Sequence, residues 1–170
     1  MPRASLSAWV AKASPYDVLS LAIAMEQAAC RQYMHMARES TNRLARAKFR
    51  YLAEEERDHV RALAEALRAI PAPKKRLALP AAALPAVKAG ADSAEAAVRV
   101  ALAEERQAEK FYDACADRCR NATTRKVFEL IADQEAHHAE VLAAELRLMD
   151  SSFAFGSIEG APPDEGDFWS

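Results

Sequence analysis

The sequence predicts an all-α protein: an antiparallel four-helix bundle made of two repeated helical hairpins joined by a long crossover. Three observations lead to this prediction, namely a helix-forming composition, four stretches with helical spacing of apolar residues, and an internal repeat. Ala, Leu, Glu and Arg dominate the 170 residues, and there are only four Gly. These residues are strong helix formers, and a chain of this length forms one domain with a substantial core.

The four stretches have apolar residues three and four positions apart, the spacing of one helix face. Ser14, followed by Pro15 and by Asp17, is a typical N-cap sequence for the first helix. Pro71 ends the second helix. The Pro-rich connection that follows is long enough for a crossover along the bundle, with a short helical piece expected around 81–87. The expected helices are roughly 15–40, 43–70, 93–119 and 124–149, within a bundle domain of residues 1–150.

The last twenty residues, 151–170, differ from the rest of the chain in composition. They contain four acidic residues and no Lys or Arg, so their charge is −4, against +2 for the rest and −2 for the whole chain. Aromatic residues stand there among Gly and Pro, and we expect no regular helix. Two interpretations stay open: a loosely ordered tail, or aromatic side chains docked on the bundle or on a neighbouring subunit.

Several classes of protein are excluded by composition. Neither charge value indicates a nucleic-acid binder, and no apolar run approaches the ~20 residues that cross a bilayer. The start of the chain lacks an apolar signal core, so we expect a cytoplasmic protein. Three Cys residues without a Cys-x-x-Cys pair argue against a disulfide framework, a zinc ribbon or an iron–sulfur module. Cys30, Cys115 and Cys119 are expected to be small core or half-exposed helix residues.

The internal repeat relates residues 25–66 to residues 104–145 with a shift of 79 and no gap. The shift also chooses between neighbouring candidates. Of three consecutive Glu residues only Glu56 matches a Glu in the other half, and His59 matches His138 rather than His137. The identical pairs include Glu26/Glu105, Tyr33/Tyr112, Asn42/Asn121, Arg46/Arg125, Phe49/Phe128, Glu56/Glu135 and His59/His138.

Six polar residues of the repeat stand in otherwise apolar helix stripes. A carboxylate in a protein core costs several kcal/mol unless it is paired, and Glu-x-x-His places both side chains on one helix face. Two divalent cations would balance four carboxylates, and two neutral imidazoles would complete the shell. Fe and Mn suit these ligands, with Zn as an alternative, and a metal-free polar core is the competing interpretation. The predicted ligands are Glu26, Glu56, His59, Glu105, Glu135 and His138.

Hairpin geometry gives an independent check on this set. In an antiparallel helix pair, residues meet at one level only when they are equally far from the turn. The midpoint of Glu26 and Glu56 is position 41, and the midpoint of Glu105 and Glu135 is position 120. Both positions fall at the expected turns, so with a rise of ~1.5 Å per residue each level lies about 20 Å from its turn.

The stretches 25–33, 53–59, 105–112 and 131–138 resemble the ferritin-like superfamily, and most of all its rubrerythrin branch. The resemblance covers roughly residues 14–150 and implies a di-iron protein, holding two Fe ions, that reacts with O₂ or peroxide. Two departures stand out. Peroxide-reducing rubrerythrins usually carry an extra Glu where this chain has Ala108, and usually carry a rubredoxin module, which is absent here. Electrons would then come from Fe(II) itself or from a separate donor protein.

Two tyrosines and one glutamate near the predicted ligands leave alternatives open. Tyr33 and Tyr112 lie two helical turns from Glu26 and Glu105. Each phenol either donates to a carboxylate of the facing pair, as an outer contact of the metal site, or is a core tyrosine with another acceptor. Glu109 is either an additional ligand or a solvated side chain.

Three functions follow from this sequence. The first is an oxidoreductase, a ferroxidase or a peroxide-reducing enzyme with an external electron donor. The second is a non-catalytic protein for metal sequestration or delivery, and the third is a structural or interaction bundle with a metal-free core. The resemblance also implies a homodimer.

Overall fold

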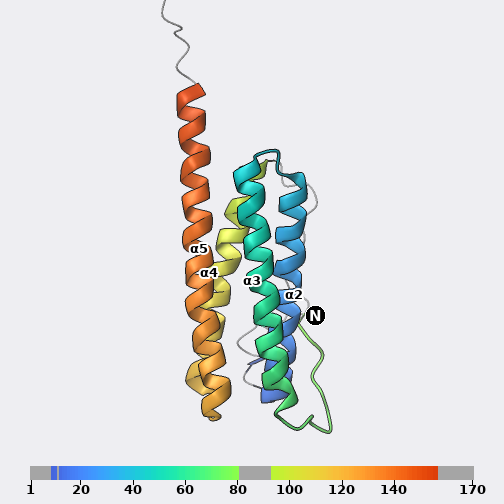
Figure 1. Cartoon of the computed structure of the whole chain (residues 1–170). Helices are drawn as coiled ribbons and strands as arrows, with labels where there is room; N and C mark the ends of the chain where they lie inside the picture. Colours follow the sequence, from blue (N-terminus) through green and yellow to red (C-terminus); the bar gives the residue numbers. More distant parts are fainter. Residues whose placement is uncertain (1–8, 11, 81–92, 157–170) are drawn as a thin grey trace, which may run out of the picture.

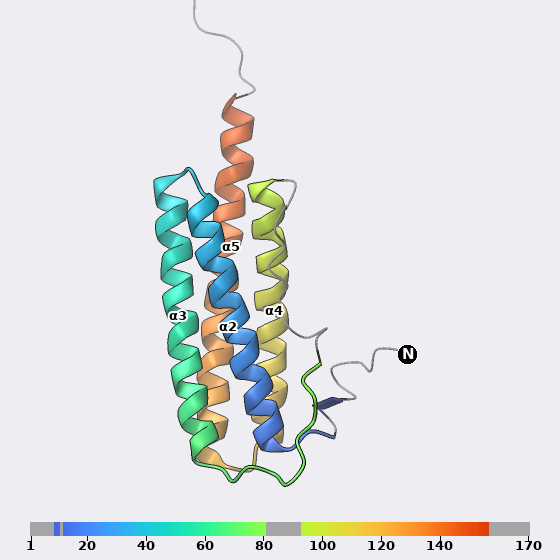
Figure 2. The same cartoon turned by 90° about the vertical axis from the view of Figure 1, so that its right-hand side faces the viewer.

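The computed structural model describes residues 9–10, 12–80 and 93–156. Within these residues there are four long helices and no strand, which confirms the predicted fold class. Figures 1 and 2 show the helices side by side in a bundle, with the second helix of each hairpin running antiparallel to the first. The helices are α2 (Pro15–Glu39), α3 (Arg43–Arg68), α4 (Ala94–Arg118) and α5 (Ala122–Gly156).

Serine caps begin the first helix of each hairpin. Ser14 caps α2. Its hydroxyl accepts a hydrogen bond from the Asp17 amide at 3.2 Å, and the Asp17 carboxylate accepts one from the Ser14 amide at 3.1 Å. This reciprocal capping box is the one that the sequence predicts. Ser93 caps α4 by accepting the amide of Ala96 at 3.1 Å. Ala96 has no side-chain acceptor for the Ser93 amide, so the reciprocal hydrogen bond of the capping box is missing in the second hairpin.

The two hairpin turns are built alike. Asn42 and Asn121 each accept a backbone amide of the helix that follows. Arg46 and Arg125 each donate to the backbone carbonyl oxygen six positions earlier, at 2.9 and 2.7 Å. These four residues belong to the repeat, so the repeat encodes the turn as well as the helices.

The connection after α3 turns at the end of the bundle and runs back beside α2 (Figure 2). Two hydrogen bonds attach it there. The Leu77 amide donates to the Asp17 carboxylate at 3.1 Å, and the Trp9 indole donates to the Ala78 carbonyl at 2.9 Å. The expected helical piece at 81–87 lies outside the described residues.

The last helix is longer than the sequence predicted. It continues to Gly156 instead of ending near 149, and Figures 1 and 2 show it projecting past the other helices at one end. The expectation of no helix from 151 onward is therefore wrong for 151–156, while 157–170 lie outside the described residues. The segment 151–156 contains no proline, so no residue in it interrupts the helix.

The apolar core consists of two clusters of buried side chains. One cluster includes Leu19, Leu63 and Ile131, and the other includes Phe49, Val98 and Leu142. The first cluster draws on the early part of α2 and the late part of α3, and the second on the opposite parts of these helices. A polar layer lies between them. No helix in the described residues has both the length and the apolar character needed to cross a membrane.

Candidate metal centre

The six predicted ligands form the polar layer between the two apolar clusters. Every one of them is at most 4% exposed, although all six are ionisable. Ionisable side chains are almost never buried this deeply without a partner. Helix α2 contributes Glu26, α3 contributes Glu56 and His59, α4 contributes Glu105, and α5 contributes Glu135 and His138.

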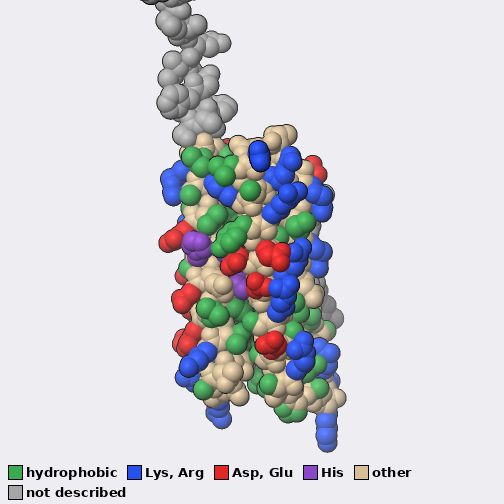
Figure 3. Space-filling view, viewed as in Figure 1, with side chains coloured by type: hydrophobic (Ala, Val, Ile, Leu, Met, Phe, Trp, Pro, Cys, Tyr) green, Lys and Arg blue, Asp and Glu red, His purple; other side chains and the backbone are tan. Residues whose placement is uncertain are grey.

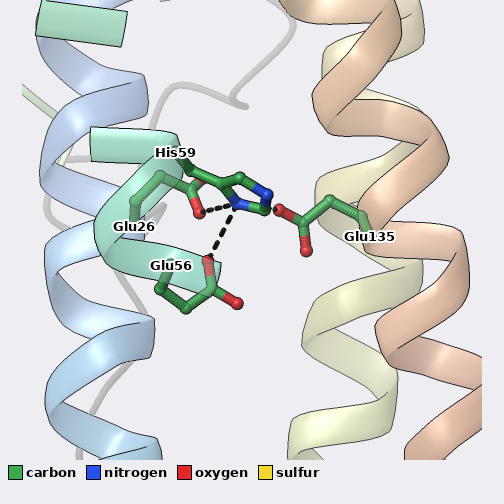
Figure 4. Close-up of side chains that lie close together, drawn as sticks. All are labelled: Glu26, Glu56, His59 and Glu135. Atoms are coloured by element: carbon green, nitrogen blue, oxygen red, sulfur yellow. Dashed lines mark hydrogen bonds and ion pairs between the residues drawn. The ribbon is translucent and has the colours of Figure 1, made fainter. Parts of the chain in front are cut away.

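The first half of the layer joins residues from α2, α3 and α5. Glu26, Glu56, His59 and Glu135 each offer one ligand atom, and these atoms lie within 4.8 Å of one another. Figure 4 shows the four side chains converging from their three helices. The His59 Nδ1 atom lies 3.2 Å from a carboxylate oxygen of each of the three glutamates. This group could hold one metal ion.

The second half has the same plan and adds a residue from α4. Glu56, Glu105, Glu135 and His138 again offer ligand atoms within 4.8 Å of one another. The His138 Nδ1 atom lies 3.1 Å from Glu56 Oε1 and 3.5 Å from Glu135 Oε2. Its ring stacks on that of His59 with 5.5 Å between centroids. Glu56 and Glu135 belong to both groups, so the layer consists of two adjacent four-ligand groups with two shared carboxylates.

Several atoms of this layer lack a hydrogen bond despite the short distances. Glu56 Oε1, Glu135 Oε1 and both ring nitrogens of His138 are buried without a hydrogen-bond partner, as is Nε2 of His59. A buried group left without a partner costs about 1–3 kcal/mol. Two divalent cations would engage the carboxylate oxygens and the Nδ1 atoms and would balance the four negative charges. The residues therefore fit a pair of cations.

The four carboxyl groups fall into two classes of acidity. Burial, with the negative charges of Glu135 and Glu56, raises the pKa of Glu26 and of Glu105 well above the usual range. Burial acts in the same direction on Glu56 and Glu135, but the close contacts of these two residues with neighbouring carboxyl groups and with the histidines outweigh it and lower their pKa values. The carboxylates of the Glu-x-x-His pairs are thus the charged ones.

The histidines carry the opposite charge in the metal-free layer. Burial alone would lower their pKa values, but the nearby carboxylates, above all Glu135, raise the pKa of His59 to about 12 and that of His138 to about 9. Two imidazolium ions then balance two carboxylates, and the other two carboxyl groups are neutral. Cations entering such a layer would replace protons rather than add charge.

Two tyrosines tie the hairpins together across the layer. Tyr33 donates a hydrogen bond to Glu105 Oε1, and Tyr112 donates one to Glu26 Oε1. Each phenol therefore donates its hydrogen bond to a carboxylate of the other hairpin and not to another acceptor. Burial and the nearby carboxylates raise the pKa of both phenols well above the usual range, so both remain donors.

The other residues singled out in the sequence lie outside both ligand groups. Glu109 is half-buried and belongs to neither group. Ala108 is half-buried and packs against the first apolar cluster. The three cysteines are free thiols: Cys115 is buried, and Cys30 and Cys119 are half-buried.

Sequence reasoning missed several polar contacts between the hairpins, and two of them are short. The Gln32 amide nitrogen donates to the Glu104 carboxylate at 2.7 Å. The Lys48 ammonium lies 2.5 Å from the carboxylate of Glu145, which is itself buried. The sequence offered one signal for the first contact. Gln32 directly precedes Tyr33 and Glu104 directly precedes Glu105, and both of these following residues are identical in the two halves of the repeat. Nothing in the sequence pattern singles out Lys48 or Glu145.

The rubrerythrin family profile matches residues 17–146 of the chain, a range that contains all six residues of the layer. The chain belongs to the rubrerythrin family. No curated protein sequence matches it significantly.

Solved structures share the fold of this rubrerythrin-family chain at low sequence identity. A hypothetical protein from Pyrococcus furiosus is 23% identical with a TM-score of 0.68, covering 83% of this chain and 93% of that one. A dodecameric thioferritin, the bacterioferritin-related protein of Bacteroides fragilis, is 21% identical with a TM-score of 0.63, covering 85% and 90%. Rhodobacter capsulatus bacterioferritin, described with a metal-free dinuclear site and haem iron, is 22% identical with a TM-score of 0.61, covering 91% and 99%.

Proposed function

We propose that this rubrerythrin-family protein binds two iron ions in the polar layer. One observation carries the proposal: two adjacent groups of four buried ligand atoms that share Glu56 and Glu135. Mixed carboxylate and imidazole ligands suit Fe and Mn, and Zn is the third candidate. The proposed ligands are Glu26, Glu56, His59, Glu105, Glu135 and His138.

We further propose that the protein is an oxidoreductase that reacts with O₂ or peroxide, as a ferroxidase or a peroxide-reducing enzyme. Iron bound in the layer would supply the redox chemistry. The chain supplies the environment: the two apolar clusters exclude bulk water, and Glu56 and Glu135 face both positions. The Tyr33 and Tyr112 phenols keep their protons and orient the two remaining carboxylates.

The proposal also covers the source of the electrons and the oligomeric state. The three cysteines provide no Cys-x-x-Cys pair, so the electrons would come from Fe(II) or from a separate donor protein. A cytoplasmic homodimer is the assembly that we propose. The similar protein from Bacteroides fragilis is dodecameric, and light scattering on the purified chain distinguishes a dimer from a larger shell.

Elemental analysis with anaerobic Fe(II) titration tests the binding step. We expect two Fe(II) per chain, and fewer than one per chain would overturn the proposed site. Rapid mixing of the Fe(II)-loaded protein with O₂ or with peroxide tests the reaction. An absorbance change that needs the oxidant supports the oxidoreductase, whereas a loaded protein inert to both oxidants would overturn it. Glu54→Ala changes an exposed neighbour of Glu56 and should behave like the wild type in both experiments.

Metal sequestration or delivery without turnover is the second candidate function. It is favoured by Ala108, which stands where peroxide-reducing relatives usually have an additional carboxylate. Repeated peroxide additions in the presence of a reductant separate the two functions. A catalyst consumes many equivalents of peroxide per chain, whereas a storage protein consumes no more than its bound iron can reduce.

A further inference from the structure

A polar pair lies between α2 and α4, directly outside the proposed ligands. Gln32 is 8% exposed, and its Nε2 donates to Glu104 Oε2 at 2.7 Å. Its other polar atom, Oε1, is buried without a hydrogen-bond partner. Gln32 directly precedes Tyr33, and Glu104 directly precedes Glu105. Because Tyr33 and Glu105 are hydrogen-bonded to each other at the metal layer, the pair lies beside that layer.

The internal repeat shows that the fold does not require a polar pair here. A shift of 79 places Gln32 on Phe111 and Glu104 on Met25. Phe111 and Met25 are 7% and 8% exposed and belong to one apolar cluster. The same place in the bundle is thus filled by an apolar pair on one side of the layer and by an amide and a carboxylate on the other.

The Gln32 side chain carries a cost that the apolar residues Met25 and Phe111 do not have. A buried amide oxygen without a partner costs about 1–3 kcal/mol, whereas the apolar pair has no such cost. A role in stability therefore does not explain why the Oε1 atom of Gln32 is buried without a partner. A buried polar atom with unused hydrogen-bonding capacity calls for an explanation, and a bound ion is one.

We propose that Gln32 and Glu104 form a capture site for a divalent cation on its way to the two-metal centre, an inference that rests on the proposed function. Carboxylate and amide oxygens are ligands that hard divalent cations accept. A half-turn of the Gln32 amide exchanges Nε2 with Oε1. The amide then changes from a donor to the carboxylate into a second oxygen ligand beside it. From there the cation passes to Glu105, the next residue along α4.

The opposite face of the bundle provides a matched control. There the Gln134 amide donates to Glu55 at 3.5 Å, and both side chains are half-buried and directly precede proposed ligands. Figure 3 shows acidic side chains gathered at mid-height on this face, between α3 and α5. Glu55→Gln removes the same charge as Glu104→Gln, at a similar place along the bundle but on the other face.

The test follows the loading of metal-free full-length protein with Co(II) by stopped-flow absorbance. Two variants remove the capture site: Glu104→Gln, which keeps the shape, and the double variant Gln32→Phe/Glu104→Met, which copies the apolar pair of the other side. We expect both to bind two Co(II) per chain at equilibrium, as the wild type does. We expect their loading rates to be at least fivefold lower, and that of Glu55→Gln to be unchanged.

Each other outcome has a defined meaning. Unchanged loading rates in both variants, or an equal slowing in Glu55→Gln, would overturn the capture site while the metal centre stands. A double variant that melts below the wild type and loads at the wild-type rate would assign the pair to structure alone and overturn the inference. If the double variant does not fold, Glu104→Gln decides. A wild type that binds no Co(II) and no Fe(II) would overturn the proposed function itself.

Discussion

The hairpins α2–α3 and α4–α5 are two copies of one design that differ outside the metal layer. Both have the same turn, with an asparagine cap and an arginine bonded to the chain six residues earlier. Both place a Glu and a Glu-x-x-His pair in the layer. They differ at the helix starts, at the Gln32–Glu104 contact and in the length of α5. The repeated features therefore build the centre, and the unrepeated ones lie around it.

Even the repeated features are not electrostatically equal. Three carboxylates lie 3.2 Å from His59 Nδ1, whereas those around His138 Nδ1 lie at 3.1, 3.5 and 4.0 Å. Burial would lower both pKa values, but these nearby carboxylates outweigh it and raise the pKa of His59 to about 12 and that of His138 to about 9. The same Glu-x-x-His pattern thus acquires different properties in the two hairpins, because the three carboxylates lie at different distances from each imidazole.

The largest expected effect comes from a residue that both groups share. Glu56→Ala removes a carboxylate from each four-ligand group, so we expect the bound metal to fall from two ions per chain toward none. Glu135→Ala should do the same, because Glu135 holds the equivalent place. Elemental analysis after Fe(II) loading and desalting measures the loss, with Glu54→Ala as the control that keeps both ions. One or more ions retained by Glu56→Ala would contradict the sharing.

A smaller effect is expected from the glutamates that belong to one group only. Glu26→Ala affects the group of His59, and Glu105→Ala affects the group of His138. We expect each variant to keep about one ion per chain, and Fe(II) titration should show one of two binding steps. Loss of both ions in either variant would show that the two groups do not fill independently.

The crossed tyrosines should have equal effects in the two hairpins. Tyr33→Phe removes the donor to Glu105, and Tyr112→Phe removes the donor to Glu26. A buried oxygen left without its donor destabilises a protein by about 1–3 kcal/mol, so we expect the free energy of unfolding of the metal-free protein to fall by this amount in each variant. Urea unfolding measures it. Tyr51→Phe, at a tyrosine that is 46% exposed, is the control and should change little.

The capping box gives the first hairpin an advantage that depends on pH. Burial alone would raise the pKa of Asp17, but hydrogen bonds from Ser14 and Leu77 and the charge of Arg76 lower it. The stabilisation is therefore present above the unfolded-state pKa of about 3.9 and is lost as the pH falls through the lower folded-state pKa. We expect Asp17→Ala to cost about 1 kcal/mol at neutral pH.

Urea unfolding of the wild type and of Asp17→Ala at several pH values measures this difference. The two proteins should converge in stability as the pH falls below the unfolded-state pKa of Asp17. A difference that stays constant down to about pH 2, where carboxylates are protonated, would assign the effect to packing rather than to charge.

The smallest effect tests whether the second hairpin can be given the cap of the first. Ala96 stands at the position equivalent to Asp17, three residues after Ser93. Ala96→Asp would complete a capping box there, and we expect about 0.5 kcal/mol of added stability in urea unfolding at neutral pH. A loss of stability would show that the start of α4 does not have the geometry of the start of α2.

Much of the fold and of the candidate site was predictable, because the repeat restricts where buried polar residues can lie. The positions of Glu26 and Glu56 relative to position 41 follow from the geometry of an antiparallel hairpin alone. The end of α5 was not predictable in this way. Local propensity in 151–156 only weakly opposes a helix, and weak propensities do not fix helix ends.

The sequence by itself determined the four helices, the two copied turns and the six polar positions on inward faces. These features depend on spacing within one hairpin, and helical spacing is regular. Only the tertiary structure decided that Glu56 and Glu135 are shared, that Tyr33 reaches Glu105, and that Gln32 meets Glu104. These contacts join one hairpin to the other. They depend on the rotation and height of each helix against its neighbour, which side-chain packing sets and sequence spacing does not.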